Sequence, residues 1–188
     1  MDHAAVDADL LRGLREGDAD ALAAAYAAHA PNVLRFLVRL TGRRDLAEDL
    51  FQETWVRLAR HARRLEADTN LRAWLLTVAR NLHRDHARWA GLDGERLEAL
   101  ARWWYLDASD RQAPESAAIA ADVGARVERA MAQLPTSARE ILSLVAGEGL
   151  AVEDAARALG LTPEAARQRL HRARAALAEI LNRQEKTP

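Results

Sequence analysis

The sequence predicts an all-α protein made of two small helical domains joined by a flexible linker. Three observations support this fold class. Ala, Leu and Arg dominate the 188 residues while Gly and Pro are few, which favours helices throughout. Apolar residues recur at helical spacing on both sides of one interruption, a stretch at 91–121 with two glycines, one proline and an acidic balance. We therefore expect domains at 1–90 and 122–188, with 91–121 as the linker.

The first domain should begin with helices of ordinary apolar spacing. A short helix around Leu10–Leu14 comes first, and Asp18 or Asp20 can cap the helix that follows. Pro31 stands where a new first turn can begin, because proline is tolerated at the first position of a helix. Gly42 is then expected at the C-terminal stop of that helix.

The stretch from Asp45 to His61 should form one amphipathic helix with a divided outer face. Asp45 is a suitable N-cap, and Glu48 stands three residues on, where the carboxylate of a capping box belongs. The predicted buried stripe is Leu46, Leu50, Phe51, Thr54, Leu58 and Ala59. The exposed acids and amide are Glu48, Asp49, Gln52 and Glu53, and the exposed bases that follow them are Arg57, Arg60 and His61. Acid before base suits the helix dipole, so these residues alone also fit an ordinary charged surface helix.

A polar loop at 65–70 should lead into a basic helix that runs from Leu71 to about Trp89. The candidate caps of this helix are Asp68, Thr69 and Asn70. Its apolar side consists of Trp74, Leu75, Val78, Ala79 and Leu82. Its other faces hold Arg72, Arg80, Asn81, His83, Arg84 and Arg88. The first domain is therefore expected to be a compact bundle whose last helix is basic.

The second domain should open with two helices before a tighter motif. A helical stripe from about Asp122 ends at Leu134–Pro135. Thr136 or Ser137 can start the next helix, and the glycines at 147 and 149 end it.

The last two helices resemble a helix-turn-helix. Gly160 permits the sharp turn between them, and Thr162 as N-cap with Pro163 as first helical residue marks a clear start. On a wheel at 100° per residue, the core-facing set is Ala166, Leu170, Ala173 and Leu177. The opposite face presents Glu164, Gln168, His171 and Arg172, flanked by Arg167 and Arg169. Gln, Arg and His can contact base edges while the flanking arginines hold phosphates, so this face predicts DNA binding.

The net charge of −1 hides two basic islands separated by acidic stretches. With His neutral, residues 57–88 sum to +5 and residues 162–183 to +3, whereas residues 1–20 and 90–122 each sum to −4. Local clusters of this kind neutralise nucleic-acid phosphates, and they are built of arginine, which forks onto phosphate or guanine. The charge distribution therefore permits a nucleic-acid partner despite the acidic total.

Composition also excludes several chemistries. The chain has no cysteine, so disulfides, thiolate nucleophiles and thiolate zinc sites are ruled out. No apolar run is long enough to cross a membrane, and the acidic start lacks the stages of a signal peptide, so we expect a cytoplasmic protein with no membrane insertion. In the linker, Trp103–Tyr105 is either a docking patch for a regulator or an aromatic cluster packed onto one domain.

Three ordered motifs together resemble the sigma-70 factors of bacterial RNA polymerase, specifically the small two-domain extracytoplasmic-function (ECF) group. The segment DLAEDLFQETWVRLAR at 45–60 resembles the helix of sigma domain two that grips the polymerase clamp. LRAWLLTVARNLHRDHAR at 71–88 resembles the helix that melts promoters and contacts the minus-ten element. The stretch 134–177 is similar to sigma domain four, which binds the minus-thirty-five element.

That resemblance implies a role for each group of candidate residues, with no catalytic residue, metal or cofactor. Core polymerase would contact Glu48, Asp49, Gln52, Glu53 and Trp55. The minus-ten region of promoter DNA would contact Asp68, Thr69, Asn70, Arg72, Arg80, Asn81, Arg84 and Arg88, with the loop 65–70 forming a pocket for a flipped base. The minus-thirty-five region would contact Glu164, Arg167, Gln168, Arg169, His171 and Arg172. An anti-sigma factor or another regulator is a further expected partner.

The sequence departs from the family pattern at two places in the second domain. Ala151 stands where a capping Ser is common, and residues 164–166 replace a common Gly-Thr-Val, so no promoter sequence is implied.

The main alternative function is that of a helix-turn-helix activator of the response-regulator type. Such an activator would have a first domain with strands, but residues 1–90 show no strand pattern. A helical protein-interaction module is a further alternative.

The enzyme alternatives rest on one short segment. His83-Arg84-Asp85 mimics a kinase triplet, yet it lies inside a helix and lacks both the downstream Asn and a glycine-rich loop. His83 and His86 have metal-ligand spacing but no evident third ligand. We therefore expect a protein that is not an enzyme.

Overall fold

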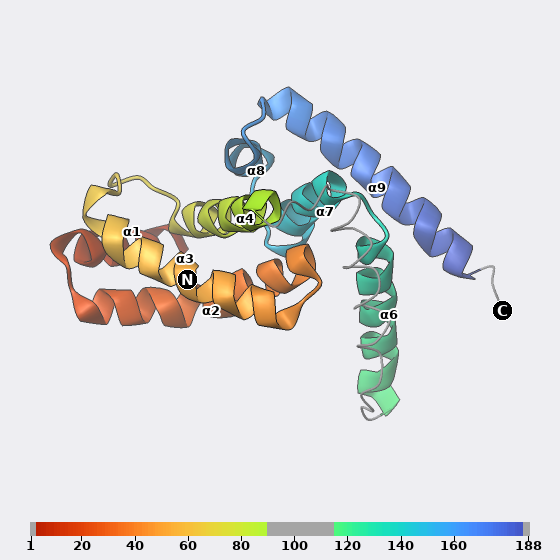
Figure 1. Cartoon of the computed structure of the whole chain (residues 1–188), viewed down its shortest axis with the longest axis horizontal. Coiled ribbons are helices and arrows are strands. Elements are labelled where there is room, and N and C mark those ends of the chain that lie inside the picture. Colours follow the sequence, from red (N-terminus) through yellow and green to blue (C-terminus); the bar gives the residue numbers. More distant parts are fainter. Residues whose placement is uncertain (1–2, 90–114, 186–188) are drawn as a thin grey trace.

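The all-α prediction is confirmed: in the computed structural model, which describes residues 3–89 and 115–185, all regular structure within those ranges is helical. The helices are α1 (His3–Glu16), α2 (Ala19–Thr41), α3 (Arg44–His61), α4 (Leu71–Trp89), α6 (Glu115–Ala132), α7 (Thr136–Leu142), α8 (Val152–Leu159) and α9 (Pro163–Glu185). A 3₁₀ turn, η1 (Ala62–Arg64), follows α3, and a π-helical turn, η2 (Ser143–Gly147), follows α7. Helices α1 to α4 form a bundle, with α7 and α8 at one end of it and α6 and α9 extending away (Figure 1).

In α2 two expectations are confirmed, at its two ends, and one is wrong, at Pro31. Asp18 is the N-cap, and its carboxylate accepts a bond from the Asp20 backbone N–H. Gly42 ends the helix in the left-handed conformation, at φ 64°, as predicted. Pro31, however, does not start a new helix, because α2 runs through it without a break. Buried residues precede and follow Pro31 along α2, so tertiary packing holds both segments on one axis.

The start of α3 also corrects the sequence-based expectation. The helix begins at Arg44, so Asp45 lies in its first turn instead of capping it. Asp45 pairs with Arg43, and Arg44 Nε donates to Glu48 Oε1 at 2.8 Å, so no capping box forms. The bond from Arg43, followed by one from a backbone N–H, lowers the pKa of the Asp45 carboxyl below its ordinary value. Acid in the first turn still favours this end of the helix through the dipole.

The burial pattern of α3 confirms half of the predicted stripe. Leu50, Thr54 and Leu58 are buried, but Ala59 is exposed. Trp55 takes its place in the core, which rotates the buried face toward α2. The outer face of α3 therefore begins with Glu48, Asp49 and Gln52, as expected.

In the C-terminal half, α6 begins at Glu115, earlier than the predicted start near Asp122 and inside the segment assigned to the linker. Gly160 takes the left-handed conformation at φ 66° between α8 and α9, where only glycine adopts it at no steric cost. Thr162 Oγ1 accepts from the Ala165 backbone N–H at 3.2 Å, so the predicted N-cap of α9 is confirmed. The aromatic cluster Trp103–Tyr105 lies outside the described residues.

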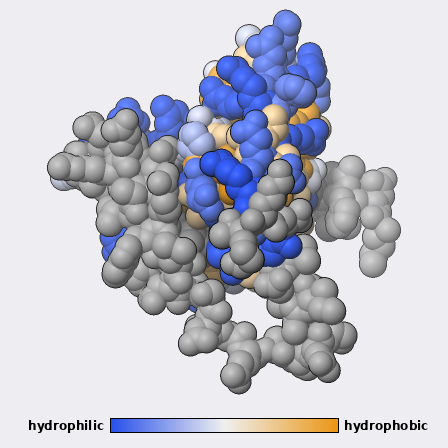
Figure 2. All heavy atoms as spheres, turned by 90° about the vertical axis from the view of Figure 1, so that its right-hand side faces the viewer, coloured by the Kyte–Doolittle hydropathy of each residue, from blue (hydrophilic) through white to orange (hydrophobic). Residues whose placement is uncertain are grey.

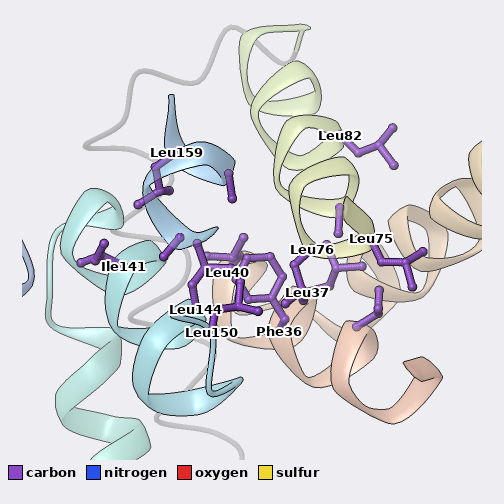
Figure 3. Close-up of a cluster of buried hydrophobic side chains, with 14 of the residues drawn as sticks. Phe36, Leu37, Leu40, Leu75, Leu76, Leu82, Ile141, Leu144, Leu150 and Leu159 are labelled. Atoms are coloured by element: carbon purple, nitrogen blue, oxygen red, sulfur yellow. The ribbon is translucent and has the colours of Figure 1, made fainter. Parts of the chain in front are cut away.

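One apolar core joins the two halves (Figure 3). The first half contributes Phe36, Leu37 and Leu40 from α2 and Leu75 and Leu76 from α4. The second half contributes Ile141, Leu144, Leu150 and Leu159, from α7 to α8. Because these side chains have almost no solvent exposure, α7 and α8 are held against the bundle by the hydrophobic effect as well as by polar contacts.

The face of the protein that carries α6 and α9 is more polar than the shared core. On the right-hand side of Figure 1, the described side chains in view are mostly hydrophilic, with hydrophobic ones visible only between them (Figure 2). Within the ranges that the structure describes, no helix is both long and apolar enough to span a membrane.

We expect Leu144→Ala to lower the free energy of unfolding by about 2–5 kcal/mol, because Leu144 has 0% exposure at the centre of the shared core. Denaturant unfolding monitored by circular dichroism measures this loss. Val56→Ala, at a side chain 40% exposed on α3, is the control and should cost about 0.5 kcal/mol or less. A loss below about 1 kcal/mol for Leu144→Ala would contradict a tightly packed core between the halves.

Candidate functional site

The outer face of α3 presents the acids and the amide that the sequence singled out. Glu48, Asp49 and Gln52 are exposed, and Glu53 is half-buried. Glu48 pairs with Arg44 at 2.8 Å and Glu53 with Arg57 at 3.2 Å, both at the four-residue spacing of a helix surface. These pairs are solvent-exposed, so they can be exchanged for contacts with a partner at little cost.

Trp55 does not lie on that surface. Its side chain is buried, and its Nε1 has no hydrogen-bond partner within the described residues. Its ring packs against Tyr26 in a tilted arrangement and against Phe51 edge to face, with ring centroids 4.8 Å and 6.0 Å away. The aromatic group that a partner would meet is Tyr26, which is 47% exposed on α2. Sequence reasoning missed Tyr26, although a lone aromatic in the alanine-rich run ALAAAYAAHA was a signal.

The loop 65–70 and α4 form a cleft together with α8. The cleft is lined by Asp68, Thr69, Asn70, Trp74 and Thr77 on one side and by Asp154 and Arg157 on the other. Asn70 Oδ1 accepts from the Ala73 backbone N–H at 3.0 Å, so Asn70 is the residue that caps α4. Its Nδ2 donates to Asp154 Oδ2 at 3.1 Å, which ties the loop to the second half.

The basic face of α4 is divided between solvent and the interface with the C-terminal half. Asn81, Arg84 and Arg88 are exposed. Arg80 is only 6% exposed, and its guanidinium donates to Glu140 Oε1 at 2.9 Å and to the Ala158 carbonyl at 3.1 Å. Arg72 is half-buried with its Nη2 3.4 Å from Glu148 Oε2. Of the predicted DNA-contacting arginines in the first half, Arg80 and Arg72 are thus occupied by carboxylates of the second half.

The final helix separates its faces as predicted. Ala166, Leu170 and Ala173 are buried, whereas Leu177 is half-buried. The opposite face exposes Glu164, Arg167, Gln168, His171 and Arg172, with Arg169 half-buried at its edge. Arg167 Nη1 lies 3.2 Å from Glu153 Oε1 of α8, a solvent-exposed pair that braces the two helices of the motif. The arrangement leaves one polar, mainly basic helix face open to a nucleic-acid groove.

His83 is a buried histidine that sequence reasoning placed on the polar side of α4. It is 2% exposed, and neither of its ring nitrogens has a hydrogen-bond partner in the part of the chain that is described. Burial, together with the positive charges of Arg139, His86 and Arg80, lowers the pKa of His83 to about 4. The imidazole is therefore neutral at neutral pH. Among the described residues, no three metal-binding side chains lie together.

Comparisons with known proteins bear on both halves. The sequence model of sigma-70 region 2 matches residues 25–91, and that of sigma-70 region 4 matches residues 124–177. The chain is 35% identical over 175 residues to the RNA polymerase sigma factor CarQ of Myxococcus xanthus, covering 91% of this chain and 95% of CarQ. It is 31% identical over 154 residues to the ECF RNA polymerase sigma factor EcfG of Rhodopseudomonas palustris, covering 82% of this chain and 81% of EcfG.

Two solved structures share the fold. The sigma factor RpoE of Bartonella quintana, determined in complex with the anti-sigma factor NepR, has a TM-score of 0.61 at 26% identity and covers 81% of this chain and 91% of its own. CnrH, determined with the cytosolic domain of CnrY, has a TM-score of 0.69 at 24% identity and covers 94% of this chain and 97% of its own. The second likeness shows the fold alone.

Acid should destabilise the protein through His83. Its folded-state pKa of about 4 lies below the ordinary value of 6.5, so the unfolded chain binds the proton more tightly. Stability from this group is complete above about pH 6.5 and falls as the pH drops toward 4, by at most about 3 kcal/mol. Thermal unfolding between pH 7 and pH 4 measures the loss.

His83→Phe removes the titrating group, so the decline with falling pH should become shallower. His61→Phe, at an exposed histidine, is the control and should leave the pH profile unchanged. Identical slopes for His83→Phe and the unaltered protein would contradict the assignment.

Proposed function

Because the chain belongs to the ECF subfamily of sigma-70 RNA polymerase sigma factors, it is a transcription initiation factor, and we propose which of its surfaces bind the polymerase core and which bind promoter DNA. The proposed divisions are residues 1–90 for core binding and the minus-ten element, 91–121 for the linker, and 122–188 for the minus-thirty-five element. The chain needs no catalytic residue for this task, since it acts by positioning DNA on the polymerase.

The outer face of α3 is the proposed site for core polymerase. Glu48, Asp49 and Gln52 are exposed on one side of a helix whose opposite side is locked into the bundle, and Glu53 lies beside them. An acidic and amide surface on a rigid helix fits a partner with basic side chains. Trp55 supports this face from below through its contacts with Tyr26 and Phe51.

The exposed face of α9 is the single observation that best supports DNA binding. Glu164, Arg167, Gln168, His171 and Arg172 share that face on the second helix of a helix-turn-helix, and Arg169 flanks it. In such motifs the side chains near the start of the second helix contact base edges in the major groove, and flanking arginines neutralise phosphates. We assign this face to the minus-thirty-five element.

The loop 65–70 and α4 are the proposed site for the minus-ten element. The cleft beside Asp68, Thr69 and Asn70 has an aromatic wall, Trp74, on which an unstacked base can lie. Arg84, Arg88 and Asn81 extend the site along the exposed basic face of α4. Arg72 and Arg80 complete it only when the carboxylates of the second half move away.

A protein regulator is also proposed. RpoE of Bartonella quintana was solved with an anti-sigma factor, and this chain shares its fold across both halves. An anti-sigma factor or a comparable regulator is therefore the expected inhibitory partner, and the cytoplasm, where core polymerase works, is the proposed compartment. The response-regulator alternative is disfavoured, because the described part of the first half is helical throughout.

We expect purified protein added to bacterial core polymerase to yield run-off transcripts from a subset of a promoter library. Sigma function consists of conferring this specificity, so the measurement is sequencing of the transcripts made with and without the protein. Core polymerase alone is the control. A transcript profile that does not change when the protein is added would contradict the proposed function.

We expect Asp49→Ala combined with Gln52→Ala to weaken binding to core polymerase about tenfold or more, because both side chains lie on the proposed contact face. Fluorescence anisotropy of the labelled protein measures the dissociation constant, and thermal unfolding checks the fold. The matched control is Glu16→Ala combined with Asn182→Ala, which removes one acid and one amide at exposed positions elsewhere. Equal affinity of both variants for core polymerase would contradict the proposal that this face of α3 binds the polymerase.

A further inference from the structure

Glu148 is a carboxylate buried between the two halves. Its side chain has 0% exposure, and it follows the π-helical turn η2 that leads toward α8. Three arginines of the first half surround it. Arg35 Nε and Arg39 Nη1 lie 3.4 Å and 3.8 Å from its Oε1, and Arg72 Nη2 lies 3.4 Å from its Oε2. Two helices, α2 and α4, thus direct guanidinium groups at one point.

The charges at this point are unequal. Arg39 also bonds to Glu128 of α6 at 2.7 Å, so two carboxylates face the three guanidinium groups of Arg35, Arg39 and Arg72. The Nε of Arg72 is buried and has no hydrogen-bond partner among the described residues. Arginines that converge on one anion with donors to spare form an anion site, because the planar fork of each matches carboxylate and phosphate oxygens alike.

Carboxylates of the second half also bind other polar side chains along α4. Arg80 is held by Glu140 at 2.9 Å, and Asn70, at the start of the helix, by Asp154 at 3.1 Å. With Arg72, these are three of the residues assigned to promoter DNA, and each is bound to a carboxylate of the second half. On the faces of α4 that are not packed against α7 and α8, Asn81, Arg84 and Arg88 are exposed.

We propose that Arg35, Arg39 and Arg72 form a binding site for backbone phosphates of promoter DNA, and that Glu148 is its intramolecular occupant in the closed protein. DNA enters the site only when the second half separates from the first. This inference rests on the proposed function, and it adds Arg35 and Arg39 of α2 to the DNA-contacting surface. The closed packing and DNA binding therefore exclude each other.

A measurable consequence follows from this exclusion. When only the open form binds DNA, the apparent dissociation constant is the intrinsic one divided by the open fraction. Weakening the contact of Glu148 raises that fraction without touching the DNA surface. By linkage, DNA must also drive the unaltered protein toward the open form.

The experiment uses the full chain, whose lack of cysteine allows two labels to be placed without interference. Ala28→Cys on α2 and Ser137→Cys on α7, both exposed, carry a donor and an acceptor dye. The probe is a labelled DNA duplex with a central mismatched bubble, added without core polymerase. Glu148→Gln should separate the dyes and tighten DNA binding about tenfold, because it raises the fraction of protein in the open form.

Two controls make the result specific. Glu16→Gln removes the same charge at an exposed position of α1 and should change neither the dye distance nor the affinity. Arg35→Ala with Arg39→Ala, added to Glu148→Gln, should abolish the gain in affinity while the dyes stay apart. A gain that survives the loss of both arginines would overturn the assignment of the phosphate site.

The unaltered protein gives a second test that does not depend on how Glu148→Gln folds. Titration with the bubble duplex should separate the dyes in step with binding, and binding at constant dye distance would overturn the proposal. So would equal affinities of Glu148→Gln and Glu16→Gln in folded proteins. Failure of this inference alone leaves run-off transcription intact, whereas failure of the proposed function abolishes promoter-specific transcripts even if Glu148→Gln opens and binds DNA.

Discussion

Burial of carboxylates against arginines, around a shared apolar core, is the interaction on which the arrangement of this protein depends. Taking a charged group out of water costs several kcal/mol in a protein interior, and the cost is offset only where an opposite charge and hydrogen bonds replace the water. Glu140 and Glu148 meet this condition only because Arg80, Arg35, Arg39 and Arg72 reach them from the other half. Loss of one partner of such an ion pair would leave the other partner buried with an uncompensated charge.

This packing decides which surfaces are open. Helix α3 keeps its acidic face toward solvent, and α9 keeps its polar face away from the bundle, so both can engage a partner without rearrangement. The start of α4, by contrast, is covered by α8, and its arginines are engaged. The closed protein therefore presents its proposed polymerase and minus-thirty-five surfaces while its proposed minus-ten surface is partly occupied.

Local signals allowed most of the helices to be predicted, and the two wrong helix starts have separate physical causes. The caps at Asp18, Asn70 and Thr162 depend on neighbouring backbone groups, so short-range chemistry determined them. Pro31 and Asp45 look like helix starts by the same chemistry. Tertiary packing overrode this preference at Pro31, where α2 continues because residues on both sides of the proline, such as His29 and Val33, are buried. At Asp45, the neighbouring Arg43 pairs with the carboxylate, and the helix begins one residue earlier. Propensity is a weak prior where burial decides.

Some features of the candidate site could likewise be predicted from local sequence, and others depend on tertiary packing. A helical period of 3.6 residues separates Gln168 and Arg172 from Ala166 and Leu170 in any context, so the solvent-facing side of α9 follows from the amino-acid order alone. The sequence also determined the acidic order on α3 and the family to which the chain belongs. Only the tertiary structure decided that Trp55 is buried beneath Tyr26, and that Arg80 and His83 lie inside instead of on a basic surface. The physical reason is that burial depends on which distant segments of the chain pack over a side chain. Arg80, for example, is buried together with Glu140, sixty residues away, and spacing within one helix carries no information about such a contact.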